Sequence, residues 1–94
     1  MAVMSDVDVS EENIDVVRES VLREKQVVKR KAEMYEERVK DFEDKHGMTS
    51  EKFLEKFESG ELGDDKEWFE WKADFQALQH LKDRLEKLEN TRIE

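Results

Sequence analysis

The sequence predicts an all-α protein: an antiparallel hairpin of two long helices with a short helix inserted between them. Apolar residues recur at helical spacing through two long stretches, proline is absent, and only three of the 94 residues are glycine. With 46% charged residues, this is the composition of long helices. The length allows one domain. We expect a flexible N-terminal arm at 1–9 and a single helical domain at 10–94, with helices over about 11–45, 50–58 and 65–90.

The first long helix is expected to begin after Ser10, a favourable N-cap, with Glu11 and Glu12 in the turn where the helix dipole favours acids. Gly47 is the type of residue most often found just past a helix end. Between these points one helix face carries apolar residues three, four or seven positions apart. They are Ile14, Val17, Val21, Val28, Ala32, Tyr35, Val39 and Phe42.

Local signals also predict the short helix and the second long one. Thr49 is placed to cap the short helix, and Met48 and Phe53 have the spacing of a hydrophobic staple around that cap. Asp64 and Glu67 have the spacing of a reciprocal cap at the start of the last helix. A nearly heptad apolar seam then follows. It consists of Trp68, Trp71, Phe75, Leu78, Leu81, Leu85 and Leu88.

The length of the first helix predicts an elongated molecule. The segment 14–44 would extend roughly 46 Å as a helix. A compact globule of 94 residues has a radius of gyration of only about 12 Å. A hairpin of this kind covers one side of each long helix and leaves part of the apolar surface exposed. We therefore expect a dimer, completed as a four-helix bundle, or a partner that covers the same surface.

Composition and charge limit the functional classes. The chain has no cysteine, which excludes a disulfide scaffold and Cys-based chemistry. No apolar run reaches the length of a membrane span, so we expect a cytoplasmic protein without membrane contact. The net charge is −9, with +3 over residues 18–40 and −7 over residues 41–74. An acidic middle segment repels nucleic acid and favours a basic protein partner.

The hinge at residues 60–71 holds both tryptophans, one of five phenylalanines and two of three glycines. Because side chains at 68 and 69 point about 100° apart on a helix, a thin hairpin cannot bury all the hinge rings. Exposed aromatic rings beside carboxylates are typical of a protein interface. We therefore predict a partner-binding site formed by Trp68, Phe69, Trp71, Asp64, Asp65, Glu67 and Glu70.

Residues 45–90 resemble a family of small helical proteins of archaea and bacteria that are described as antitoxin-like or of unknown function. The resemblance is carried by Gly47-Met48-Thr49-Ser50, by Phe53-Leu54 with Phe57, by Gly60-Glu61-Leu62-Gly63-Asp64-Asp65, and by Trp68-Phe69-Glu70-Trp71. It covers about half of the chain. It implies a cytoplasmic partner-binding protein that neutralises a toxin, and it implies no catalytic residues.

Two alternatives to an antitoxin-like module remain open. One is a self-associating four-helix-bundle protein with a structural role. The other is a di-metal helical bundle based on Glu43 and His46, whose spacing puts a carboxylate and an imidazole on one helix face. Glu67, Glu70 and Asp74 are interpreted as a solvated carboxylate stripe, and His80 as a surface histidine. We expect no catalytic residue, cofactor or metal.

Overall fold

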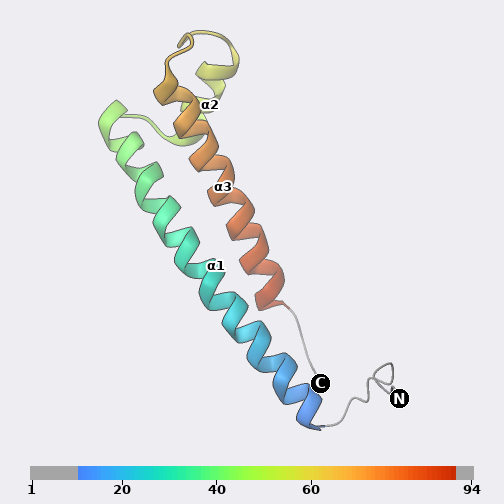
Figure 1. The fold of residues 1–94 in the computed structure, drawn as a ribbon. Coiled ribbons are helices and arrows are strands. Elements are labelled where there is room, and N and C mark those ends of the chain that lie inside the picture. Colours follow the sequence, from blue (N-terminus) through green and yellow to red (C-terminus); the bar gives the residue numbers. More distant parts are fainter. Residues whose placement is uncertain (1–10, 91–94) are drawn as a thin grey trace.

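We describe residues 11–90 of a computed structural model, with side chains from residue 14 onward. This part of the chain forms three helices and no strand: α1 (Glu11–His46), α2 (Ser50–Glu58) and α3 (Lys66–Glu89) (Figure 1). The predicted all-α class, with two long helices packed against each other, is confirmed. The predicted flexible arm at 1–9 and the predicted cap at Ser10 lie outside the described residues.

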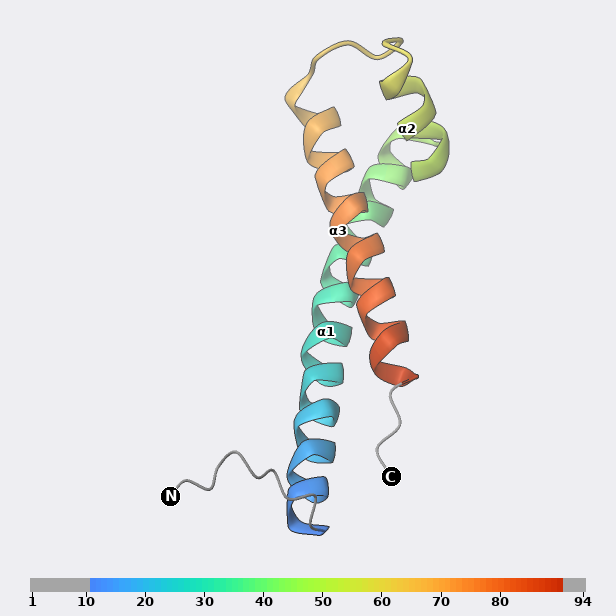
Figure 2. The same cartoon turned by 90° about the vertical axis from the view of Figure 1, so that its right-hand side faces the viewer.

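The two long helices run antiparallel, and α2 lies across one end of the pair, on one side of it (Figure 2). α1 has 36 residues and α3 has 24, so the N-terminal part of α1 continues past the end of α3 (Figures 1 and 2). The molecule measures 61 × 23 × 18 Å and has a radius of gyration of 19.6 Å. It is therefore elongated, as the length of the first helix predicts.

The helix ends around α2 form where the sequence signals predict them. Gly47 follows α1 with a φ of +64°, and its N–H donates to the carbonyl oxygen of Glu43 at 2.8 Å. Thr49 then caps α2, because its hydroxyl oxygen accepts the N–H of Lys52 at 3.2 Å. Met48 and Phe53 both belong to the core beside this cap. The two long helices can reverse direction here because glycine adopts the left-handed backbone readily.

The predicted cap of the last helix is wrong. The residue at the N-cap is Asp65, not Asp64, and its side chain makes no capping hydrogen bond. Glu67 does not reach back to the start of its own helix, because its carboxylate is bound by residues of α1 instead. Both hinge glycines have positive φ, +84° at Gly60 and +83° at Gly63. The hinge conformation thus depends on its glycines rather than on a reciprocal cap.

The core lies at the hinge end, where all three helices meet. Phe53 and Trp71 are completely buried, and their rings stack 3.9 Å apart at an interplanar angle of 4°. Val39, Phe75 and Leu78 complete the buried cluster. Away from this end, Val28 and Leu88 are the other buried apolar side chains among the described residues. The hinge end therefore holds most of the buried apolar side chains of the described residues.

Several apolar side chains of α1 stay exposed, as a two-helix hairpin predicts. Val17, expected in the apolar stripe, is exposed because α3 ends before it reaches this level. From residue 14 onward, the other exposed large hydrophobic side chains of α1 are Val16, Leu22, Val27 and Met34. Among the described residues, no helix has the length and apolarity needed to cross a membrane.

Candidate protein-interaction site

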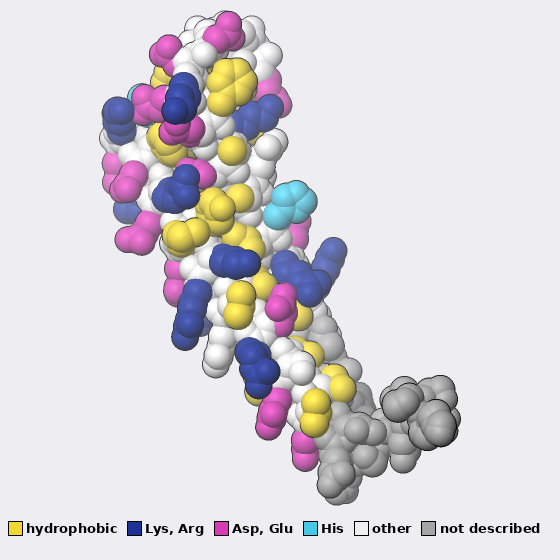
Figure 3. All heavy atoms as spheres, viewed as in Figure 1, with side chains coloured by type: hydrophobic (Ala, Val, Ile, Leu, Met, Phe, Trp, Pro, Cys, Tyr) yellow, Lys and Arg dark blue, Asp and Glu magenta, His cyan; other side chains and the backbone are white. Residues whose placement is uncertain are grey.

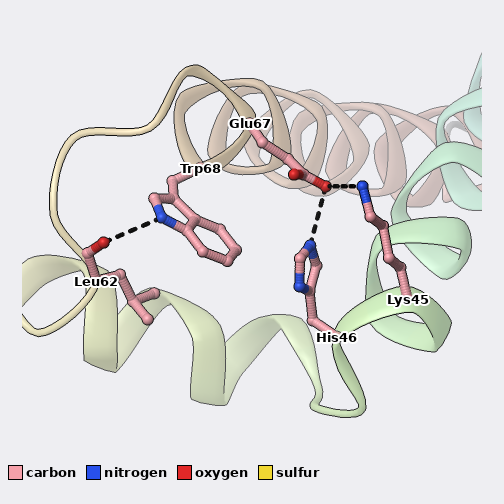
Figure 4. Close-up of polar contacts among 5 residues, drawn as sticks. All are labelled: Lys45, His46, Leu62, Glu67 and Trp68. Carbon is pink, nitrogen blue, oxygen red and sulfur yellow. Dashed lines mark hydrogen bonds and ion pairs between the residues drawn. The ribbon is translucent and has the colours of Figure 1, made fainter.

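The last turn of α1 is joined to the first turn of α3 through one carboxylate. Glu67 Oε1 accepts a hydrogen bond from Lys45 Nζ at 2.8 Å and lies 2.9 Å from His46 Nε2 (Figure 4). The bond from Lys45, together with the contact from His46, lowers the pKa of Glu67 below its ordinary value. Glu67 therefore holds the two long helices together at the hinge and is already paired.

Aromatic rings surround His46 on the inner side of this contact. Its ring lies 4.7 Å from the Trp68 ring and stacks 5.4 Å from the Trp71 ring at 18°. The indole N–H of Trp68 donates to the carbonyl oxygen of Leu62 at 3.1 Å, which ties the hinge loop to α3 (Figure 4). The half-buried Trp68 thus positions the loop that precedes its own helix.

A buried polar chain links all three helices. The indole N–H of Trp71 donates to Ser50 Oγ at 2.9 Å, and Ser50 is completely buried. Ser50 donates from both its hydroxyl and its backbone N–H to Glu43 Oε2, each at 2.8 Å. Every buried polar side-chain atom among the described residues has a partner. The hinge core is therefore satisfied, as a stable polar core requires.

The interpretation of the α3 carboxylates as a solvated stripe is wrong for two of its three members. Asp74 is buried, and both of its oxygens lie 3.1 Å from guanidinium nitrogens of Arg38. Glu67 is half-buried and paired with α1, as described above. The exposed Glu70, 3.8 Å from Lys66, fits the prediction. The partners of Asp74 and Glu67 lie on α1, so the spacing of carboxylates along α3 does not reveal them.

Phe69 is the hinge ring that the fold leaves on the surface. Its side chain is 52% exposed, and it meets the Phe57 ring edge-on at 5.1 Å and 88°. Lys72 Nζ lies 5.5 Å from the centre of the same Phe57 ring. A rigid, half-exposed ring supported by a second ring is a suitable anchor for a protein partner.

The structure divides the predicted partner-binding residues into three groups, which are buried, half-buried and exposed. Trp71 is part of the core and presents no ring to the surface, because α1 and α2 cover it. Trp68 and Glu67 are half-buried, each with an internal hydrogen-bond partner. The remaining predicted residues are exposed on the hinge loop and the first turns of α3. They are Asp64, Asp65, Phe69 and Glu70.

Sequence reasoning did not find the polar residues that support this site. Ser50 follows the capping threonine and carries no signal of burial, and Arg38 lies in a helix rich in charged residues. The spacing of Glu43 and His46 singled out His46 for a different role, and nothing in the sequence marked Lys45 as a partner of the last helix. These residues act through contacts between helices, which spacing along one helix does not reveal.

The Glu43 and His46 side chains do not meet at a shared site. Glu43 accepts from Ser50, and His46 contacts Glu67. Among the described residues no three His, Cys, Asp or Glu side chains are grouped as metal ligands would be. His80 is exposed, as expected.

No protein-family model, curated protein or solved structure matches the chain. The geometry of the hinge end alone supports the candidate site. The resemblance of residues 45–90 to the antitoxin-like family stays an expectation.

Proposed function

We propose that this chain is a non-catalytic protein-interaction module whose hinge end binds a basic protein. The observation that carries the proposal is the exposed Phe69 ring, held edge-on against Phe57 and set beside the exposed carboxylates of Asp64, Asp65 and Glu70. An aromatic anchor inside a polar rim is the usual anatomy of a protein interface. The hydrogen-bonded core beneath Phe69 supports the proposal, because a rigid anchor loses little entropy on binding.

The charge of the hinge end defines the partner class. Residues 41–74 carry −7, and carboxylates predominate on the exposed surface of α2 and the loop after it. Such a surface attracts a basic partner and repels nucleic acid. The exposed acids of residues 41–74 are Asp41, Asp44, Glu51, Glu55, Glu58, Glu61, Asp64, Asp65 and Glu70.

The resemblance of residues 45–90 suggests a specific form of this function. We infer a cytoplasmic, antitoxin-like protein that neutralises a basic toxin by covering it. The surface described above supports this form because an acidic interface with an aromatic anchor would compete for a basic toxin surface.

The hairpin also presents apolar surface away from the hinge. Val16, Val27 and Met34 on α1 remain exposed to solvent. A second helical layer, from a partner or from a second copy of this chain, would bury them and complete a bundle.

Co-purification from the native operon tests the hinge-end proposal. We expect the tagged full chain to recover a small basic protein in stoichiometric amount. Phe69→Ala should weaken that complex by about 1–2 kcal/mol, or roughly tenfold in Kd. Asp64→Lys should weaken it in a salt-dependent manner. Leu22→Ala is the matched control, since Leu22 is equally exposed but lies on α1.

Two results would contradict the proposal. One is a complex of unchanged affinity with Phe69→Ala, which would place the interface elsewhere. The other is recovery of an acidic protein or of nucleic acid alone. A growth assay separates the antitoxin form from simple binding: only a neutralising protein rescues cells that express the recovered partner.

A further inference from the structure

The pair of long helices has two broad sides, and α2 occupies only one of them. Glu51 of α2 lies in the groove with Lys40, Phe75 and Lys82 on the covered side. The opposite groove is lined by Arg38, Glu70 and neighbouring residues of α1 and α3, with no residue of α2. We call this second side the open face. It faces the viewer in Figure 3, with α2 behind the long helices.

An interrupted line of hydrophobic side chains runs along the open face (Figure 3). Met34 and Val27 lie four and eleven residues before Arg38, so they share its side of α1. Their side chains are 47% and 43% exposed. Ala77 lies midway between Glu70 and Arg84 at heptad spacing on α3. Since Arg38 pairs with Asp74 and Glu24 with Arg84, the antiparallel register places Ala77 beside Met34.

On the α3 side of this face, the order of the charges is complementary to the same order reversed. On α3, the exposed acid Glu70 lies seven residues before Ala77, and the exposed base Arg84 lies seven residues after it. An acid at one end, a small apolar residue in the middle and a base at the other end match a second copy turned end for end. This self-complementary pattern is what a two-fold symmetric interface requires.

We propose that the open face packs against the open face of a second copy, in antiparallel orientation about Met34 and Ala77, to form a four-helix bundle. In this arrangement Glu70 of each copy meets Arg84 of the other. The parallel arrangement would instead place the two −7 segments side by side, where like charges repel. Ala77 at the centre allows the helices to approach closely, and Val27 and Met34 are removed from water.

The inference rests on the part of the proposed function in which a second helical layer completes the hairpin. Glu70 belongs to both surfaces, but Phe69, the anchor of the hinge-end proposal, is not among the residues that line the open groove, so the two proposals have different central residues. The following experiments use the full chain alone, without a partner, so the two proposals can fail separately.

Cysteine cross-linking tests the orientation, because the chain contains no cysteine of its own. Ala77→Cys alone should form a disulfide-linked dimer under mild oxidation, since the antiparallel arrangement brings the two copies of residue 77 together. Lys40→Cys, on the covered side, is the control and should stay monomeric on a non-reducing gel. A parallel dimer would overturn the orientation: it would leave Ala77→Cys unlinked and cross-link a mixture of Met34→Cys and Ala77→Cys chains.

Sedimentation equilibrium tests the face itself. Wild type should be dimeric at micromolar concentration, and Met34→Glu should raise the dimer Kd at least about tenfold. Leu22 is 57% exposed and lies outside the open face, so Leu22→Glu should leave the Kd unchanged. Circular dichroism checks that both variants keep their helix content. A monomeric wild type, or equal weakening by both changes, would overturn the proposal.

Charge reversal gives an independent readout of the Glu70 contact. Glu70→Arg and Arg84→Glu should each raise the dimer Kd, and the double variant should return it toward the wild-type value. If the double variant lost as much dimerisation free energy as the two single variants together, the contact between copies would be contradicted.

Discussion

The indole N–H of Trp71 donates a 2.9 Å hydrogen bond to the hydroxyl of Ser50, and both residues are completely buried. The same hydroxyl donates to Glu43, so one small side chain connects the three helices. The largest ring of the core is thereby held in one orientation, with α2 attached to it. The surface position of Phe69, two residues before Trp71, follows from that orientation.

Ser50→Ala should destabilise the fold by about 1–3 kcal/mol, because it leaves the buried indole N–H without an acceptor and removes a donor to Glu43. The measurement is the free energy of unfolding from urea denaturation. Ser59→Ala is the matched control, since Ser59 is exposed and its hydroxyl bonds only the nearby carbonyl of Lys56. If both variants lost a similar amount of unfolding free energy, the buried hydrogen bonds of Ser50 would contribute nothing specific to stability.

Arg38→Ala should cost about 1.5–3 kcal/mol of unfolding free energy, because it leaves the buried Asp74 carboxylate without its charged partner. Lys40→Ala on the same helix should cost less than about 0.5 kcal/mol, since both side chains of its pair with Asp44 are largely exposed. A double-mutant cycle with Asp74→Ala isolates the interaction. Additive losses in that cycle would contradict a direct coupling between Arg38 and Asp74.

The pairing of Glu67 predicts a dependence of stability on pH. The folded state lowers the pKa of Glu67 below its ordinary value of 4.5, so the unfolded state binds the proton more readily. The contribution of Glu67 is therefore fully present above about pH 4.5 and is lost as the pH falls through the folded pKa. Wild type should be more stable than Glu67→Gln near neutral pH, and the difference should shrink in acid.

Urea denaturation between about pH 7 and pH 3 measures this difference. Glu55→Gln is the control, because Glu55 is exposed on α2 and lies outside the open face. The unfolding free energy of this control variant should change with pH in parallel with that of wild type. A constant gap between wild type and Glu67→Gln at every pH would mean that the gap does not come from the ionised carboxylate.

The sequence predicted those parts of the fold whose signals are local. The cap at Thr49 and the left-handed Gly47 depend on residues within one turn, and both are found. Helical spacing also predicted that two long helices pack together. It could not show where α3 stops covering α1, and so it did not predict that Val17 is exposed.

The polar part of the site could not be predicted in the same way. Asp74 binds a residue 36 positions away, and Trp71 binds one 21 positions away. Heptad spacing placed Trp71 in the seam but could not reveal that Asp74 lies buried beside it. The sequence predicted that the rings of Trp68 and Phe69 point in different directions. Which ring reaches the surface depends on where α2 lies.

Trp71→Ala and Phe69→Ala should differ sharply in stability. Trp71 stacks on Phe53 at 3.9 Å and on Phe42 at 5.6 Å, so its removal empties a large site and should cost about 3–5 kcal/mol. Phe69 makes one edge contact with Phe57, so its loss should cost less than about 1 kcal/mol.

Far-UV circular dichroism in urea measures both variants, because helix signal does not depend on the tryptophan removed. The loss in Trp71→Ala is a large part of the roughly 5–15 kcal/mol that stabilises a typical domain, and this variant could unfold entirely. Trp71→Phe keeps most of the ring stacking and loses the indole N–H, so it should fall between wild type and Trp71→Ala. Equal destabilisation by Phe69→Ala and Trp71→Ala would mean that Phe69 belongs to the core, and the hinge end would then lack its exposed anchor.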